Sequence, residues 1–190
     1  MARWEPNARE RLVLAALDLF TEQGYDNTTV TEIAERAGLT KTTFFRHFPD
    51  KREVLFAGQE VHSRLLADGA AAAPDSATPL EAVAAALDAL TASFTAEQRE
   101  FGPRLAAVIA GHPELQERAA FKHAALAVAL TSALGKRGVP DLTASVAADL
   151  GVRAFDRAFD RWIEPSSQQA FTELAHEELQ ALRTAALALG

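Results

Sequence analysis

The sequence of 190 residues contains no cysteine. This absence excludes disulfides, thiolate catalysis and cysteine-ligated zinc, and it favours a reducing cytosol as the compartment. Long apolar runs are also missing, because no stretch approaches the roughly 20 residues that a membrane-spanning helix needs. The first ten residues, MARWEPNARE, lack the apolar core of a signal peptide. We therefore expect a cytoplasmic protein with no membrane partner.

Signatures of catalysis are absent as well. The sequence has no G-x-S-x-G elbow, no P-loop and no G-x-G-x-x-G motif. Four histidines fall on different expected helices without the H-x-x-x-H spacing of a metal site, namely His62, His112, His123 and His176. An acid or base role of His112 or His123 stays open, although ligand contact or a surface position is favoured. We expect no catalytic residue, no metal and no cofactor, so the protein is not predicted to be an enzyme.

The residues that are present indicate an ordinary globular chain, with 48% hydrophobic and 24% charged residues. Apolar residues recur at spacings of three and four, and strand-like alternation is missing, which predicts an all-α fold of about nine helices. The expected helices span residues 6–23, 29–37, 40–48, 50–68, 80–96, 98–110, 113–136, 141–163 and 167–189.

The stretch from Thr28 to Phe48 predicts two short helices joined by a glycine turn. Thr29 and Glu32 have the spacing of a capping box, Gly38 is suited to a left-handed turn, and Thr40 is placed to cap the second helix. This pattern is typical of a helix-turn-helix, although capped helix pairs also occur as plain supports in all-helical proteins. Side chains suited to phosphates and base edges would project from the second helix, namely Lys41, Thr42, Thr43, Phe45, Arg46 and His47.

Charge is distributed unevenly along the chain. The formal net charge is -7, but residues 36–52 carry five basic residues and one acidic residue, a local net of +4. Lys51 and Arg52 would lie in the first turn of the next helix, where cations oppose the helix dipole, so we expect a nearby DNA phosphate. Arg3, Arg9 and Arg11 form an arm that could touch phosphate, although an exposed tail is the favoured interpretation.

The run from Phe20 to Leu55, FTEQGYDNTTVTEIAERAGLTKTTFFRHFPDKREVL, resembles the amino-terminal signature of the TetR family of bacterial transcriptional regulators. The resemblance implies double-stranded operator DNA as a partner. Two positions depart from the family pattern, because Phe45 stands where tyrosine is usual and Thr42 where glycine is common, so packing is the safer role for Phe45. The DNA contacts implied by position are Thr29, Thr40, Lys41, Thr43, Phe45, His47 and Lys51, with Arg46 influencing sequence preference and Thr42 beside them.

The carboxy-terminal part resembles TetR regulators that bind acyl-CoA-like ligands, through GHPELQERAAFKHAAL, GKRGVPD and FDRAFDRWIE between Gly111 and Glu164. Many alanines beside isolated aromatic residues can line a cavity, although aromatic residues at helical spacing more often form plain core. A small apolar effector is therefore an expected partner. The predicted ligand pocket consists of Phe94, Phe101, Arg104, His112, Phe121, His123, Phe155, Phe159 and Trp162.

The last expected helix carries an apolar stripe, suited to pairing with another helix, at Phe171, Leu174, Leu182, Ala185 and Leu189. The preceding helix carries a matching stripe, so two chains would form a four-helix interface. Both stripes could instead close the core of one chain, but the resemblance favours a homodimer.

These features predict three regions: residues 1–49 as the DNA-binding domain, 50–68 as a connecting helix, and 69–190 as a ligand-binding and dimerisation domain. The predicted function is a homodimeric repressor that binds an inverted-repeat operator and is released by an apolar, acyl-type molecule. The alternative is a helical small-molecule-binding protein whose helix-turn-helix no longer binds DNA.

Overall fold

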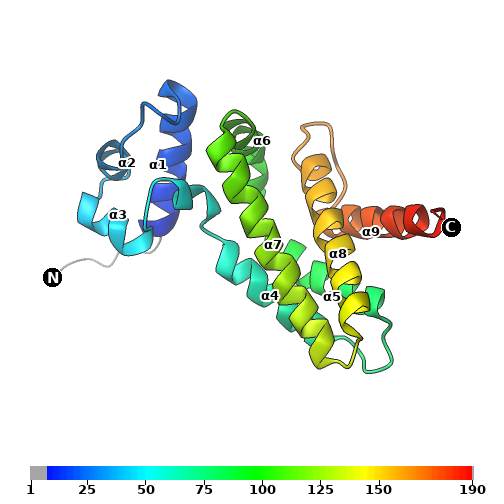
Figure 1. The fold of residues 1–190 in the computed structure, drawn as a ribbon. Helices are drawn as coiled ribbons and strands as arrows, with labels where there is room; N and C mark the ends of the chain where they lie inside the picture. Colours follow the sequence, from blue (N-terminus) through cyan, green and yellow to red (C-terminus); the bar gives the residue numbers. More distant parts are fainter. Residues whose placement is uncertain (1–7, 190) are drawn as a thin grey trace. The chain divides into compact units, whose positions relative to one another are not determined.

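A computed structural model describes residues 8–189, and every regular element in that range is helical (Figure 1). The all-α prediction is therefore confirmed, with nine α-helices and one 3-10 helix among the described residues. No helix in this range is both long enough and apolar enough to cross a membrane. The chain folds into two compact units, one of residues up to 58 with residues 104–120, and one of residues 59–103 with 121–190.

The first unit is built around α1 (Ala8–Gln23), which packs on α2 (Val30–Arg36), while α3 (Lys41–His47) packs on α2 (Figure 1). A short 3-10 helix, η1 (Arg52–Phe56), follows. The end of α6 (Ala96–Ala110) and the start of α7 (Pro113–Lys136) complete this unit. Its core is a cluster of fully buried side chains that includes Leu12, Ile33, Phe44, Val54 and Leu115.

The second unit contains α4 (Gln59–Ala72), α5 (Pro79–Thr91), α8 (Asp141–Trp162) and α9 (Phe171–Leu187), with the remaining parts of α6 and α7. The closest packing is between α4 and α5 and between α8 and α9. At Gly69 of α4 a Cβ atom would lie 2.8 Å from the carbonyl oxygen of Ala85 and 2.8 Å from Cα of Ala86, so glycine permits the close crossing with α5.

The structure differs from the prediction after Pro49. One helix was expected over residues 50–68, but the chain forms η1, turns at residues 57–58 and begins α4 at Gln59. Asp50 does act as a cap, since its Oδ1 accepts from the backbone N–H groups of Arg52 at 2.8 Å and Glu53 at 3.1 Å. Gly58 lies at this break, and because glycine is unfavourable inside a helix, it disfavours one continuous helix through this point. The compact units divide after residues 58, 103 and 120, and the predicted functional division at residues 49 and 68 remains a prediction.

Candidate functional site

Three local features define the helix pair α2 and α3. Thr29 and Glu32 form the capping box, in which Oγ1 of Thr29 accepts from the N–H of Glu32 at 3.2 Å and the Glu32 carboxylate accepts from the N–H of Thr29 at 2.8 Å. Gly38 has a φ of +66°, and a Cβ there would lie 2.7 Å from the guanidinium of Arg11. Oγ1 of Thr40 accepts from the N–H of Thr43 at 3.1 Å and caps α3. The predicted helix-turn-helix is therefore present with its caps.

The outer face of α3 is polar apart from one ring. Phe44 is fully buried, whereas the side chains of Lys41, Thr42, Phe45 and Arg46 are exposed. At about 100° per residue these four side chains fall within an arc of roughly 140°. This narrow face presents a lysine and an arginine together, which is the chemistry that binds phosphate oxygens and guanine edges.

Four further predicted contacts lie at helix starts or beside the core. The hydroxyls of Thr40 and Thr43 lie 3.0 Å apart, and that of Thr29 donates to Glu32 at 2.7 Å. His47 is half-buried, and its Nε2 atom is buried with no hydrogen-bond partner within residues 8–189. Burial lowers the pKa of His47, and the charges of Arg46 and Arg9 lower it further.

Lys51 is engaged by the protein itself. Its Nζ donates to the carbonyl oxygens of Tyr25 at 2.7 Å and Thr28 at 3.0 Å, and it lies 4.0 Å from the centroid of the Tyr25 ring. The Tyr25 side chain is buried, which together with nearby acidic groups raises its pKa to about 12. Because an ammonium has three donors, at most one N–H of Lys51 is left for a phosphate.

Of the predicted arginine arm, Arg3 lies outside the described residues. The guanidinium of Arg9 lies 5.3 Å from the centroid of the Phe48 ring, and Arg11 donates to the carbonyl oxygen of Ala37 at the end of α2. Arg11 therefore supports the turn between α2 and α3.

The predicted ligand-pocket residues divide into a clustered set and a scattered set. Four aromatic residues come together in the second unit with Phe171, and the ring centroid of Phe94 lies 5.1 to 6.1 Å from those of Phe155, Phe159, Trp162 and Phe171. His62 stacks on Phe94 at 5.1 Å, and burial lowers the pKa of His62. These rings fill the space between them, so this cluster is packed core.

The other predicted pocket residues are scattered. Arg104 and His112 belong to the first unit, where Arg104 pairs with Asp18 at 2.7 Å and the ring of His112 lies 5.2 Å from that of Tyr25. Phe101 is half-buried, and Phe121 is 63% exposed. Nδ1 of His123 lies 3.2 Å from the carboxylate of Asp156. That these nine residues form one ligand pocket remains a prediction.

The predicted dimer stripe is also divided. Phe171 and Leu174 are buried in the core of their own chain, Leu182 is half-buried, and Ala185 and Leu189 are exposed. Only the later part of this stripe is therefore available to a partner.

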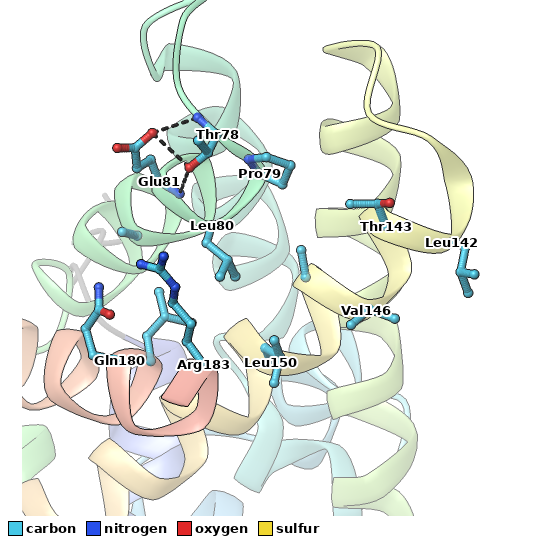
Figure 2. A pocket seen from close by; sticks show the side chains of 13 residues that line it. Thr78, Pro79, Leu80, Glu81, Leu142, Thr143, Val146, Leu150, Gln180 and Arg183 are labelled. Atoms are coloured by element: carbon cyan, nitrogen blue, oxygen red, sulfur yellow. Dashed lines mark hydrogen bonds between the residues drawn. The ribbon is translucent and has the colours of Figure 1, made fainter. Parts of the chain in front are cut away.

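The structure instead shows a groove of about 650 Å³ between α5, α8 and α9 (Figure 2). Its apolar wall includes Leu80, Leu142, Val146 and Leu150, and Leu142 is 79% exposed and Val146 50% exposed. Arg183 and Glu81 both line the groove, and their charges interact. Sequence reasoning missed this face, although the spacing of four between Leu142, Val146 and Leu150 was the available signal.

Similarity in sequence to known proteins is concentrated in the amino-terminal part of the chain. Residues 12–57 match the family described as bacterial regulatory proteins, tetR family. The HTH-type transcriptional regulator TcmR of Streptomyces glaucescens is 37% identical over 82 residues, which are 43% of this chain and 36% of TcmR. The match thus spans about a third of that relative's length.

Two solved structures are similar in fold over most of the chain. GusR of Salmonella enterica has a TM-score of 0.58 at 17% identity, covering 97% of this chain and 95% of GusR. FadR of Bacillus subtilis, solved with stearoyl-CoA, has a TM-score of 0.56 at 17% identity, covering 91% of this chain and 96% of FadR.

Proposed function

Because residues 12–57 belong to the TetR family of bacterial regulatory proteins, we propose that this chain is a transcriptional repressor that binds an inverted-repeat DNA operator as a homodimer. The observation that carries the proposal is the capped helix pair whose α3 exposes Lys41, Thr42, Phe45 and Arg46 on one face. A helix of seven residues reads only a few base pairs, so two copies are needed to cover a full site.

A homodimer with two-fold symmetry matches the symmetry of such an operator. The proposed contact surface consists of the exposed apolar side chains of α8 together with Leu187 and Leu189 at the end of α9. Burying these side chains against a second chain would remove apolar surface from water. This face replaces the buried Phe171 and Leu174 as the proposed centre of the dimer contact. An isologous contact of this kind gives the two α3 helices the two-fold symmetry of an inverted repeat.

An apolar, acyl-type effector is the proposed signal for release. The stearoyl-CoA bound to FadR and the alanine-rich, aromatic composition of α7 and α8 support this ligand class. Since the aromatic cluster is packed, such a ligand must displace a ring there or enter elsewhere. To change the ratio of the DNA-binding to the released conformation from 99:1 to 1:99, the ligand must bind the released conformation about ten-thousandfold more tightly. The proposed lever is the chain from Asp50 through α4.

The first experiment selects bound fragments from a genomic library and measures their affinity by fluorescence anisotropy. We expect Arg46→Ala to weaken binding and to relax preference at one base position, whereas Lys136→Ala, at the exposed end of α7, is the matched control and leaves affinity unchanged. Scrambling one half of the selected site should nearly abolish binding. If no DNA fragment is selected, the proposed DNA-binding function is wrong, and the alternative of a small-molecule-binding protein is favoured.

The second experiment titrates fatty-acyl-CoA esters against the protein–operator complex. In a Trp4→Phe background Trp162 is the sole tryptophan, so its emission reports binding while anisotropy reports release. Saturable binding that leaves operator affinity unchanged rejects the switch.

A further inference from the structure

Phe45 is an aromatic side chain that the fold leaves uncovered. Its exposed fraction is 49%, while its neighbour Phe44 is fully buried. The two rings meet edge to face, with centroids 5.5 Å apart and an interplanar angle of 82°. The contact with Phe44 holds the inner edge of the Phe45 ring, so the outer part projects from the helix in a defined direction.

Phe45 lies in the middle of the proposed DNA-reading face. At about 100° per residue, it is placed roughly 40° from Lys41 and 100° from Arg46 around α3, on the same side as Thr42. A surface that both cations reach must therefore also meet the phenyl ring. The ring cannot be left out of the contact by turning the helix, because that would also withdraw one of the cations.

The chemistry of a phenyl ring restricts what it can meet. Phenylalanine has no donor or acceptor, so contact with a phosphate would desolvate the charge without replacing a hydrogen bond. On the major-groove edges of the four base pairs, the C5-methyl group of thymine is the one methyl group, beside hydrogen-bond donors and acceptors and flat ring C–H groups. A tyrosine at this position could bond a phosphate through its hydroxyl, and phenylalanine cannot.

From this geometry we propose that Phe45 packs on a thymine C5-methyl group and selects thymine at one position of each half-site. Phe45 is thus a specificity-determining residue that acts by apolar contact beside the polar contacts of Lys41 and Arg46. This inference rests on the proposed DNA-binding function and adds a base preference to it.

The test replaces each thymine of a selected operator, one at a time, by deoxyuridine, which removes only the methyl group. We expect one position per half-site at which wild-type affinity falls about fourfold per half-site, the value for one buried methyl-sized group. Phe45→Ala should weaken binding to the unmodified operator and show no further loss at that deoxyuridine. Phe45→Leu, which keeps an apolar side chain, should retain part of the discrimination.

Two controls keep the outcomes separate. Phe121→Ala removes a ring that is 63% exposed in the second unit, and it should leave the deoxyuridine profile unchanged. Circular dichroism of the full chain verifies that the Phe45 variants are folded. Absence of any operator defeats the proposed function itself. An operator bound tightly but equally well with deoxyuridine at every position, or an Ala variant with the wild-type profile, overturns the role of Phe45.

Discussion

The ammonium of Lys51 lies 4.0 Å from the ring centroid of Tyr25 and donates a hydrogen bond of 2.7 Å to the carbonyl oxygen of the same residue. A second hydrogen bond, to the carbonyl oxygen of Thr28, ties the exit of α3 to the turn between α1 and α2. Thr28 is followed by Thr29, which caps α2. Lys51 therefore supports the start of the helix-turn-helix, besides any phosphate it contacts.

Lys51→Met keeps most of the aliphatic length and removes the charge. We expect the free energy of unfolding to fall by about 1–3 kcal/mol, because two buried carbonyl groups lose a charged donor. Thermal unfolding of the full chain, followed by circular dichroism, measures the change. An unchanged midpoint would show that Lys51 does not brace the turn. The salt dependence of operator binding measures the phosphate contact separately, since losing one contact flattens the slope by about 0.9.

Gly69→Ala tests the crossing of α4 on α5. The added Cβ would lie 2.8 Å from backbone atoms of Ala85 and Ala86, so we expect a loss of about 1–3 kcal/mol in the free energy of unfolding. Gly135→Ala is the matched control, because a Cβ there has no atom within 4 Å and replaces a helical glycine. Gly135→Ala should raise the free energy of unfolding by about 0.4–1 kcal/mol. Chemical denaturation of both variants measures the difference, and an equal effect contradicts the close crossing.

His123 and Asp156 couple the stability of the second unit to pH. The hydrogen bond that the His123 ring donates to the carboxylate of Asp156 raises the pKa of His123 above its usual value of about 6.5, despite an opposing effect of burial. Its stabilising contribution is therefore complete below about pH 6.5 and is lost as pH rises through the raised value. Asp156→Asn should lower the unfolding midpoint more at about pH 5.5 than at about pH 8.5. An NMR titration of His123 that gives the same pKa in both proteins contradicts the pairing.

Leu142→Glu tests the proposed dimer face. Because this side chain is 79% exposed, the substitution should cost the monomer little, but it would introduce a charge into an apolar contact. We expect dimerisation to weaken at least tenfold, as measured by light scattering over a concentration series. Val128→Glu, at a 69% exposed position on α7, is the control. If Leu142→Glu stays dimeric and Val128→Glu does not, the dimer contact lies on α7.

The helix-turn-helix could be predicted from the sequence because its determinants are local. Thr29 with Glu32, Gly38 and Thr40 fix caps and a turn within a few residues of themselves, and each does so in the structure. Phe45 was likewise expected to project from the second helix, and 49% of its surface is exposed, while its neighbour Phe44 is buried.

The pocket could not be predicted in the same way. Helical spacing places Phe155, Phe159 and Trp162 on one face of α8. Whether these rings line a cavity or fill it depends on Phe94 and Phe171, which come from other parts of the chain. The position of Arg104 and His112 in the first unit likewise depends on contacts between segments far apart in the sequence. Gly58 was the available signal for the break between η1 and α4.

Leu115 is fully buried in the core of the first unit, although it lies far along the chain from the other members of that core. During synthesis at about 5–20 residues per second, Leu115 is therefore added seconds after Val54 and Leu55. Until then the nascent α1–α3 segment carries an uncovered apolar surface, which is open to chaperones and to neighbouring nascent chains on the same messenger RNA. The part of this protein that we propose to read DNA is thus the first to be made and among the last to be finished.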